Sequence, residues 1–174
     1  MSGHSKWSQI KHKKGVADQK KGQLFSKLSK VISIAARRGT DPAMNMELKN
    51  AIEKAREANM PKDNVERAIK RVSDKNAAQL EELAIEAIGP DSLALIIMAI
   101  TDNKNRTMAE VKKILSEFGY KPGSVMWAFT KQGKDFVPQY PIENLSEETK
   151  NNLEKLFERL DENEDVQEVY VNLK

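Results

Sequence analysis

The spacing of the apolar residues changes from a helical to a strand-like period near residue 80, which divides the chain into two differently built halves. Before this point, apolar residues recur every three or four positions, as on one face of a helix. After it, short apolar runs alternate with helical stretches, and the most apolar run is 93–100. We therefore predict a helical domain at 1–75 and an α+β domain at 80–174, joined through the polar residues 73–79.

Three amphipathic helices are predicted in the first half. The first runs over 17–38. The second opens at Asp41-Pro42, with Asp41 as the cap and Pro42 as the first helical residue, and the third restarts at Pro61. Together they predict a three-helix bundle, preceded by a basic arm at residues 3–16.

The second half predicts a sheet covered by helices. Residues 93–100 are too apolar for a sheet edge and predict a buried central strand. Thr107 and Glu110 have the spacing of a capping box that opens a helix. The other predicted elements are strands at 83–88 and 166–173, a hairpin from 124–130 and 136–137, and a helix at 146–161. This order predicts an α/β sandwich, in which a mostly antiparallel sheet carries two helices on one face.

The residues that many enzymes and metal sites need are missing from the sequence. It has no cysteine, which excludes a disulfide, a thiolate zinc site and a thiol nucleophile. Its two histidines, His4 and His12, are too few for a structural metal. No phosphate-binding glycine loop and no Gly-x-Ser-x-Gly elbow occurs. We expect no cofactor, no metal, no small-molecule substrate and no enzymatic activity.

Apolar runs are short throughout the chain. None resembles a signal peptide, and the run at 93–100 is far too short to span a bilayer. We therefore expect a cytoplasmic protein that does not contact a membrane.

Charge is distributed very unevenly along the chain. Residues 1–75 contain 18 Lys and Arg against 8 Asp and Glu, a net charge of +10, whereas residues 76–174 contain 11 against 18, a net charge of −7. Like charges gathered on one surface repel each other unless a counter-surface offsets them. The first half is therefore expected to face a polyanion, and nucleic acid is the predicted partner.

The predicted nucleic-acid contacts lie in the arm and along one flank of the first helix. Each lysine that meets a phosphate releases counterions, so binding is expected to weaken steeply with salt. Trp7 either stacks on an unpaired base or anchors the arm to the bundle, and a solvated tail is the alternative for the lysines. The predicted contact residues are Lys6, Trp7, Lys11, His12, Lys13, Lys14, Lys20, Lys21, Lys27, Arg37 and Arg38.

Two polar segments of the second half leave alternatives open. The first follows the predicted central strand and consists of Asp102, Asn103, Lys104, Asn105 and Arg106. Its side chains either bind a partner or only lead the chain, through Asx turns, into the helix capped by Thr107. The acidic residues 161–165 form either a solvated turn or a contact with a basic protein surface.

Several long strings of uncommon residue combinations are spread along the chain. They include Gly3-His4-Ser5-Lys6-Trp7, Ala58-Asn59-Met60-Pro61-Lys62-Asp63-Asn64, Thr101-Asp102-Asn103-Lys104-Asn105-Arg106-Thr107, Gly123-Ser124-Val125 and Asp165-Val166-Gln167. These strings resemble the YebC family of transcriptional regulators, whose mitochondrial relatives are translational activators. The resemblance implies a helical N-terminal domain followed by α/β domains, a cytoplasmic location, and DNA-binding transcriptional regulation. Some members resemble ribosome-associated translation factors instead.

One part of the family pattern is missing from this chain. Family members usually insert a further α/β domain after the position of Phe129, whereas here 130–140 lead almost directly into the closing segment at Pro141. A function that depends on a cleft between the second and third domains is therefore not carried over. Two targets remain open, DNA and the ribosomal RNA of the ribosome. A lysine-rich arm with no evident groove-reading helix favours phosphate contact without base readout, which suits ribosomal RNA slightly better than a DNA operator.

Overall fold

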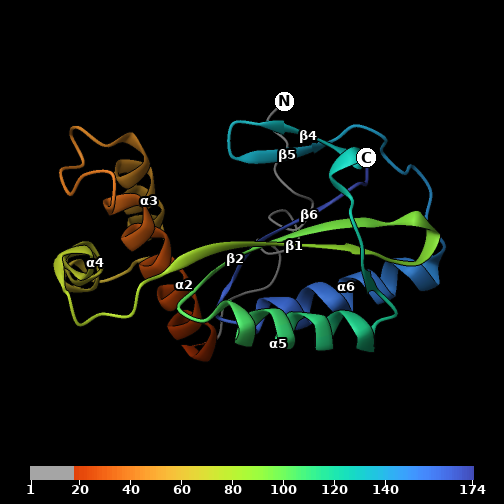
Figure 1. Ribbon diagram of the computed structural model, residues 1–174, viewed down its shortest axis with the longest axis horizontal. Helices are drawn as coiled ribbons and strands as arrows, with labels where there is room; N and C mark the ends of the chain where they lie inside the picture. Colours follow the sequence, from red (N-terminus) through yellow and green to blue (C-terminus); the bar gives the residue numbers. More distant parts are fainter. Residues whose placement is uncertain (1–17) are drawn as a thin grey trace. The chain divides into compact units, whose positions relative to one another are not determined.

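Figure 1 shows the computed structural model, which describes residues 18–174. These residues divide into two compact units, a helical unit of 18–82 with 100–103 and an α+β unit of 83–99 with 104–174. The predicted α+β fold class is confirmed, while the predicted domain division at 1–75 and 80–174 stays a prediction. None of the helices within 18–174 is long and apolar enough to cross a membrane.

The helical unit is a bundle of three helices around a small apolar core. Its elements are α2 (Asp18–Ala36), α3 (Met46–Glu57), α4 (Lys62–Lys70) and the 3-10 turn η1 (Arg71–Ser73). α2 packs against both α3 and α4 (Figure 1). Ile32 and Leu48 are fully buried between the helices, and Ala68 joins them from α4. The predicted three-helix bundle is therefore confirmed.

The second helix begins later than predicted, at Met46 instead of Pro42. Asp41 caps a separate turn, in which its carboxylate accepts the backbone N–H of Ala43 at 2.9 Å. The N-terminal cap of α3 is Asn45. A local capping pattern at Asp41 therefore competes with a second one four residues later, and the later one starts the helix.

Asn45 starts the helix because its side chain forms hydrogen bonds both with the first turn of α3 and with the end of α2. The amide oxygen accepts the backbone N–H of Leu48 at 3.1 Å, as an N-terminal cap does. The amide nitrogen donates to the carbonyls of Ala35 and Gly39, each at 2.8 Å. These bonds join the start of α3 to the end of α2, and sequence spacing gives no sign of them.

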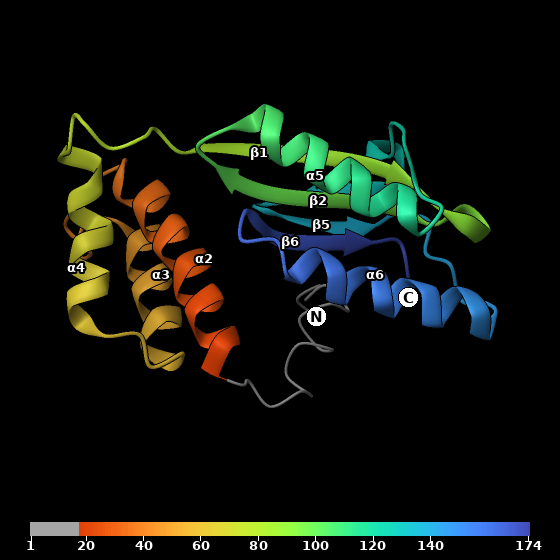
Figure 2. The ribbon, with the colours of Figure 1, turned by 90° about the horizontal axis from the view of Figure 1, so that it is seen from below.

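The second half contains a sheet, a hairpin and two helices. Its strands are β1 (Glu81–Ile88), β2 (Ala94–Thr101), β3 (Lys121–Pro122), β4 (Phe129–Gln132), β5 (Asp135–Pro138) and β6 (Val166–Val171); its helices are α5 (Lys104–Glu117) and α6 (Glu147–Asp161), with 3-10 turns η2 (Pro90–Ser92) and η3 (Met126–Ala128). Four strands form one sheet in the order β3-β1-β2-β6, and β4 and β5 form the hairpin. β3 pairs antiparallel with β1, and β6 pairs antiparallel with β2. Figure 2 shows α5 and α6 on the same face of the sheet, which confirms the predicted sandwich.

The strand β2 is apolar along its length because both of its faces are covered. Leu95 and Ile97 are fully buried toward α5 and α6. Ile96 is fully buried toward the other face, where Phe129 and Phe136 of the hairpin pack. A strand buried on both faces is expected to be a continuous apolar run rather than an alternating one. The prediction of a central strand is confirmed.

The predicted hairpin was placed partly too early. The segment before Phe129 forms the turn η3 instead of a strand, because the backbone N–H groups of Val125 and Met126 donate to the carboxylate of Glu86 at 2.6 and 3.2 Å. The hairpin runs from β4 to β5 through Gly133, whose φ of +64° suits glycine. The short connection leaves no inserted domain between these two strands.

The predicted capping box of Thr107 and Glu110 is wrong. α5 begins at Lys104, so Thr107 lies inside the helix, where it is fully buried. The hydroxyl of Thr107 donates to Asp165 at 2.6 Å, and the carboxylate of Glu110 accepts from Asn163 at 2.9 Å. Both side chains therefore hold the turn before β6 instead of capping their own helix.

Candidate nucleic-acid interface

The predicted arm lies outside the described residues. This applies to the predicted contacts Lys6, Trp7, Lys11, His12, Lys13 and Lys14. Both readings of Trp7, as a stacking residue or as an anchor, stay predictions. The described part of the predicted interface consists of cations on α2 and immediately after it.

The cations on α2 differ in their access to solvent. Lys20 and Lys21 are exposed in the first turn of the helix. Lys27 is only 5% exposed, so its ammonium group is not open to a polyanion in this conformation. The predicted phosphate contact of Lys27 stays a prediction, and it requires a rearrangement that exposes the ammonium group.

Arg37 and Arg38 follow the last residue of α2 and have different partners. Arg38 forms an ion pair with Glu47, in which Nη1 lies 2.7 Å from Oε1, and the Arg38 side chain is 72% exposed. Water screens such a pair, so a phosphate can compete for the guanidinium. Arg37 donates through Nη2 to the backbone carbonyl of Leu80 and contacts no carboxylate within 18–174.

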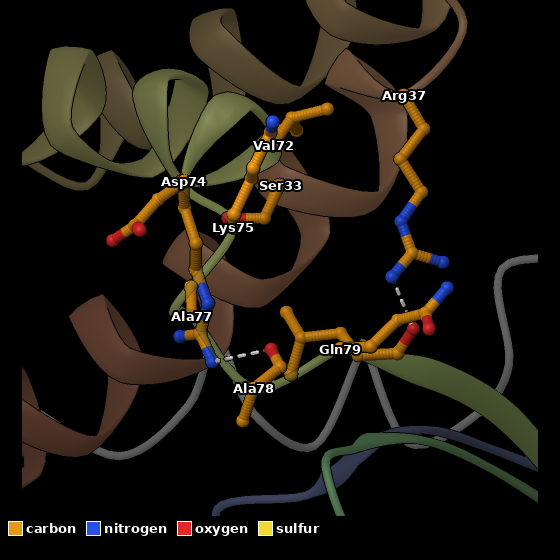
Figure 3. A pocket seen from close by; sticks show the side chains of 10 residues that line it. Ser33, Arg37, Val72, Asp74, Lys75, Ala77, Ala78 and Gln79 are labelled. Atoms are coloured by element: carbon orange, nitrogen blue, oxygen red, sulfur yellow. Dashed lines mark hydrogen bonds between the residues drawn. The ribbon is translucent and has the colours of Figure 1, made fainter.

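Arg37 lines a pocket of about 400 Å³ inside the helical unit (Figure 3). The pocket lies between the end of α2, the turn η1 and the segment 74–80. Arg71 and Lys75 add two further cations to its wall, and Asp74 adds the one carboxylate among its lining residues. Arg71 donates through Nη2 to the carbonyl of Ala78 at 3.2 Å.

Sequence reasoning missed the grouping of these three cations. Arg37 and Arg71 are 34 positions apart, and only the packing of α2 against the end of α4 brings both to the lining of one pocket. The available signal was the charge of Arg71 and Lys75 in a polar segment, which by itself is typical of a solvated linker.

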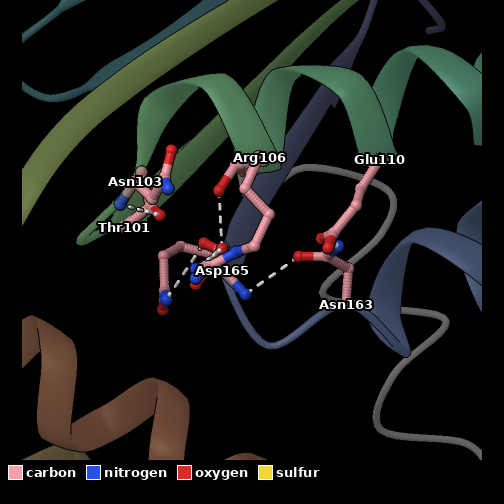
Figure 4. Close-up of polar contacts among 8 residues, drawn as sticks. Thr101, Asn103, Arg106, Glu110, Asn163 and Asp165 are labelled. Carbon is pink, nitrogen blue, oxygen red and sulfur yellow. Dashed lines mark hydrogen bonds and ion pairs between the residues drawn. The ribbon is translucent and has the colours of Figure 1, made fainter.

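The predicted partner loop is exposed and leads directly into α5. Asp102, Asn103, Lys104, Asn105 and Arg106 are all exposed, and Lys104 begins the helix. The backbone N–H of Asn103 donates to the hydroxyl of Thr101 at 2.9 Å (Figure 4). This local turn supports the structural alternative for the start of the loop, while partner binding stays a prediction.

The end of the loop is neutralised by a buried carboxylate. The Nη2 atom of Arg106 lies 2.9 Å from Oδ2 of Asp165, which also accepts the Thr107 hydroxyl at 2.6 Å (Figure 4). Asp165 is 4% exposed, so the expectation of a solvated acidic turn at 161–165 is wrong at this residue. Its burial is stabilised because a cation and a hydroxyl satisfy its charge.

Comparisons with known proteins show which family this chain resembles along its length. The TACO1/YebC protein N-terminal domain matches residues 5–75, and the TACO1/YebC second and third domain matches residues 80–135. A crystal structure of a conserved hypothetical protein from Aquifex aeolicus superposes with a TM-score of 0.86 at 29% identity, covering 98% of this chain and 97% of that chain.

Curated relatives agree with the domain matches. A "Probable transcriptional regulatory protein" of Petrotoga mobilis is 44% identical over 174 residues, covering 97% of this chain and 69% of the relative. A protein of the same description from Treponema denticola is 51% identical over 153 residues, covering 85% of this chain and 61% of the relative. The chain thus spans about two thirds of the length of these relatives. Because the two domain matches account for most of its residues, the chain belongs to the TACO1/YebC family.

Proposed function

We propose that this chain is a non-enzymatic regulator of gene expression that binds nucleic acid through the positively charged helical unit, with DNA as the target. Its relatives in Petrotoga mobilis and Treponema denticola are both described as probable transcriptional regulatory proteins. The family and the names support regulation, and the charge of this chain supports contact with a polyanion.

The observation that carries the proposal is the concentration of positive charge on α2. Residues 18–40 contain six Lys and Arg against one Asp, whereas residues 41–70 contain six against six. α3 and α4 are therefore balanced by their own acids. Of the described residues, those of α2 and the two arginines after it carry the excess charge.

The position of Lys20 and Lys21 also points to a role outside the helix. The positive end of the helix dipole lies at its N-terminus, where cations are unfavourable and acids are favoured. Two exposed lysines in this first turn thus weaken α2 slightly instead of stabilising it. Contact with phosphate groups accounts for their position, and the predicted arm at residues 3–16 ends shortly before them.

Fluorescence anisotropy with a short duplex DNA tests the proposal. Lys20→Gln with Lys21→Gln removes two phosphate contacts, so we expect the slope of log affinity against log salt to become less steep by about 1.8. The matched control is Lys49→Gln with Lys54→Gln, which removes two exposed lysines from the charge-balanced α3. If neither DNA nor ribosomes bind the intact chain at moderate salt, the proposed function is wrong.

Ribosomal RNA is the alternative target, because contacts made to phosphates alone do not distinguish it from DNA. Sedimentation of the chain with purified ribosomes, at the same salt concentration as the DNA titration, separates the two. Binding to ribosomes at protein concentrations that leave the duplex free assigns the protein to translation. If the chain binds the duplex but does not sediment with ribosomes, a role in transcription is supported.

A further inference from the structure

The pocket of the helical unit has the charge of an anion site. Arg37, Arg71 and Lys75 line it, and Asp74 is the single carboxylate beside them. The Asp74 carboxylate accepts the backbone N–H of Asn76 at 2.9 Å. Within residues 18–174, no carboxylate forms an ion pair with any of the three cations. The pocket therefore keeps an excess of positive charge.

The two arginines have unused donors. A guanidinium carries five N–H groups, and Arg37 and Arg71 each direct one terminal nitrogen to a backbone carbonyl of the segment 78–80. The Nε atom of Arg71 is buried and has no acceptor among the described residues. A buried charged donor without an acceptor is costly, so the site favours an acceptor that enters from outside the chain.

We propose that this pocket binds one phosphate group of a nucleic-acid backbone. Guanidinium groups match the oxygens of phosphate, to which they donate two parallel bonds, and a lysine adds a point charge. The volume of about 400 Å³ lies in the range of small-ligand sites, so a phosphate that carries a sugar on each side fits. The inference rests on the proposed function, since Arg37 belongs to both surfaces.

Occupation of the pocket has a consequence for the segment that leads out of the bundle. The same two guanidinium groups hold the carbonyls of Ala78 and Leu80. A phosphate that binds the free edge of each guanidinium leaves these bonds in place and fills the space next to them. The segment 74–80 is therefore part of the binding site, and nucleic acid is expected to hold it more firmly against the bundle.

The side-chain N–H resonance of Arg71 Nε in ¹H–¹⁵N NMR spectra tests the proposal. Arg71→Lys identifies the resonance by removing it while the positive charge is kept. We expect inorganic phosphate to shift the resonance with a saturable dependence, and chloride at equal ionic strength to leave it in place. No shift with phosphate, or an equal shift with chloride, means that water alone occupies the site and overturns the proposal.

Variants measure how much each cation contributes. Arg71→Gln is expected to weaken phosphate binding about tenfold, because it removes a charge-assisted bond. Lys75→Gln is expected to weaken it about threefold, and since no described residue hydrogen-bonds to Lys75, this variant keeps the fold intact. Arg56→Gln removes an exposed arginine of α3 away from the pocket and serves as the control. Equal losses in all three variants contradict a specific site.

A duplex DNA titration distinguishes the source of the phosphate. A shift of the Arg71 resonance by the duplex supports the proposal. If phosphate shifts it and the duplex does not, the backbone assignment is overturned and the site takes a free phosphate. If the duplex binds with the salt dependence of Lys20 and Lys21 but leaves the resonance unmoved, the pocket proposal fails and the proposed function stands. If the duplex does not bind at all, DNA is not the target, and the sedimentation with ribosomes decides whether the rest of the proposed function stands.

Discussion

Two arginines of the helical unit and two of the α+β unit bond to different kinds of partner. In the α+β unit, Arg106 pairs with the buried Asp165, and the exposed Arg159 pairs with Glu162 at 2.5 Å. In the helical unit, Arg37 and Arg71 bond to backbone carbonyls, which leaves their charge uncompensated. Hydrogen bonds to carbonyls fix an arginine in position without neutralising it. Arg37 and Arg71 are therefore held in position while their positive charge remains uncompensated.

The comparison extends to two buried polar atoms that lack an acceptor among the described residues. One is Nε of Arg71 in the helical unit, and the other is the hydroxyl of Tyr120 in the α+β unit. Tyr120 is 1% exposed within an apolar core, where no ligand can reach it. The Arg71 side chain lines the pocket, although its Nε atom is itself buried. The same observation thus indicates a small loss of stability in one unit and supports the proposed phosphate site in the other.

The largest expected effect is on the buried carboxylate of the α+β unit. Asp165→Ala leaves Arg106 and Thr107 without their shared acceptor, and we expect a loss of about 2 to 3 kcal/mol in the free energy of unfolding. The estimate is below that of a fully buried pair, because the Arg106 side chain is 45% exposed. Urea unfolding measures it, with the exposed Glu154→Ala as the control. A loss equal to that of the control contradicts the structural role of Asp165.

Asn45→Ala tests how much the helical unit is stabilised by side-chain hydrogen bonds to backbone groups. It removes the cap of α3 and two bonds to the end of α2, so we expect a loss of about 2 kcal/mol. Thermal unfolding followed by circular dichroism measures the loss. Asn50→Ala, an exposed position on the same helix, is expected to change little. Because alanine has a higher helix propensity than asparagine, an equally large loss in Asn50→Ala contradicts the assignment of the effect to the Asn45 side-chain bonds.

Tyr120→Phe is expected to stabilise the α+β unit by about 1 kcal/mol, because it removes a buried hydroxyl that has no acceptor. Burial, with a smaller contribution from the charge of Asp91, raises the pKa of Tyr120 to about 12. The unfolded chain loses this proton near pH 10, before the folded protein does, so stability declines as the pH rises from 10 toward 12. The decline is expected to be weaker in Tyr120→Phe than in the exposed control Tyr140→Phe. Identical pH profiles refute this assignment.

The smallest expected effect concerns the ion pair of Arg38. Glu47→Gln removes the half-buried partner of a largely exposed arginine, so the free energy of unfolding is expected to change by less than about 0.5 kcal/mol. Nucleic-acid affinity at low salt is expected to rise about twofold, because Arg38 is released for phosphate contact. Glu53→Gln removes an equal charge from α3 without touching Arg38. An equal rise in both variants indicates a general charge effect instead of a released arginine.

Prediction from the sequence succeeded where one face of an element determines its structure. α6 was predicted at 146–161 and observed at Glu147–Asp161, since Leu153, Leu156, Phe157 and Leu160 lie on one buried face. Prediction failed where two patterns of similar strength competed, as at the start of α3, and where a distant partner decided the role of a residue. Thr107 has the spacing of a cap, yet Asp165, 58 positions further on, takes its hydrogen bond.

The amino-acid sequence alone determined the helical and strand periods, the central position of β2, the charge asymmetry and the family resemblance. These properties depend on residues that are close together in the chain or on composition. Only the tertiary structure decided that Arg37 and Arg71 share a pocket, that Lys27 is buried and that Asp165 is not solvated. Each of these depends on which distant residues pack together, and packing sets both the dielectric surroundings and the available partners of a charge. The sequence therefore shows that this chain is rich in lysine and arginine, and the fold decides which of these side chains can contact a polyanion.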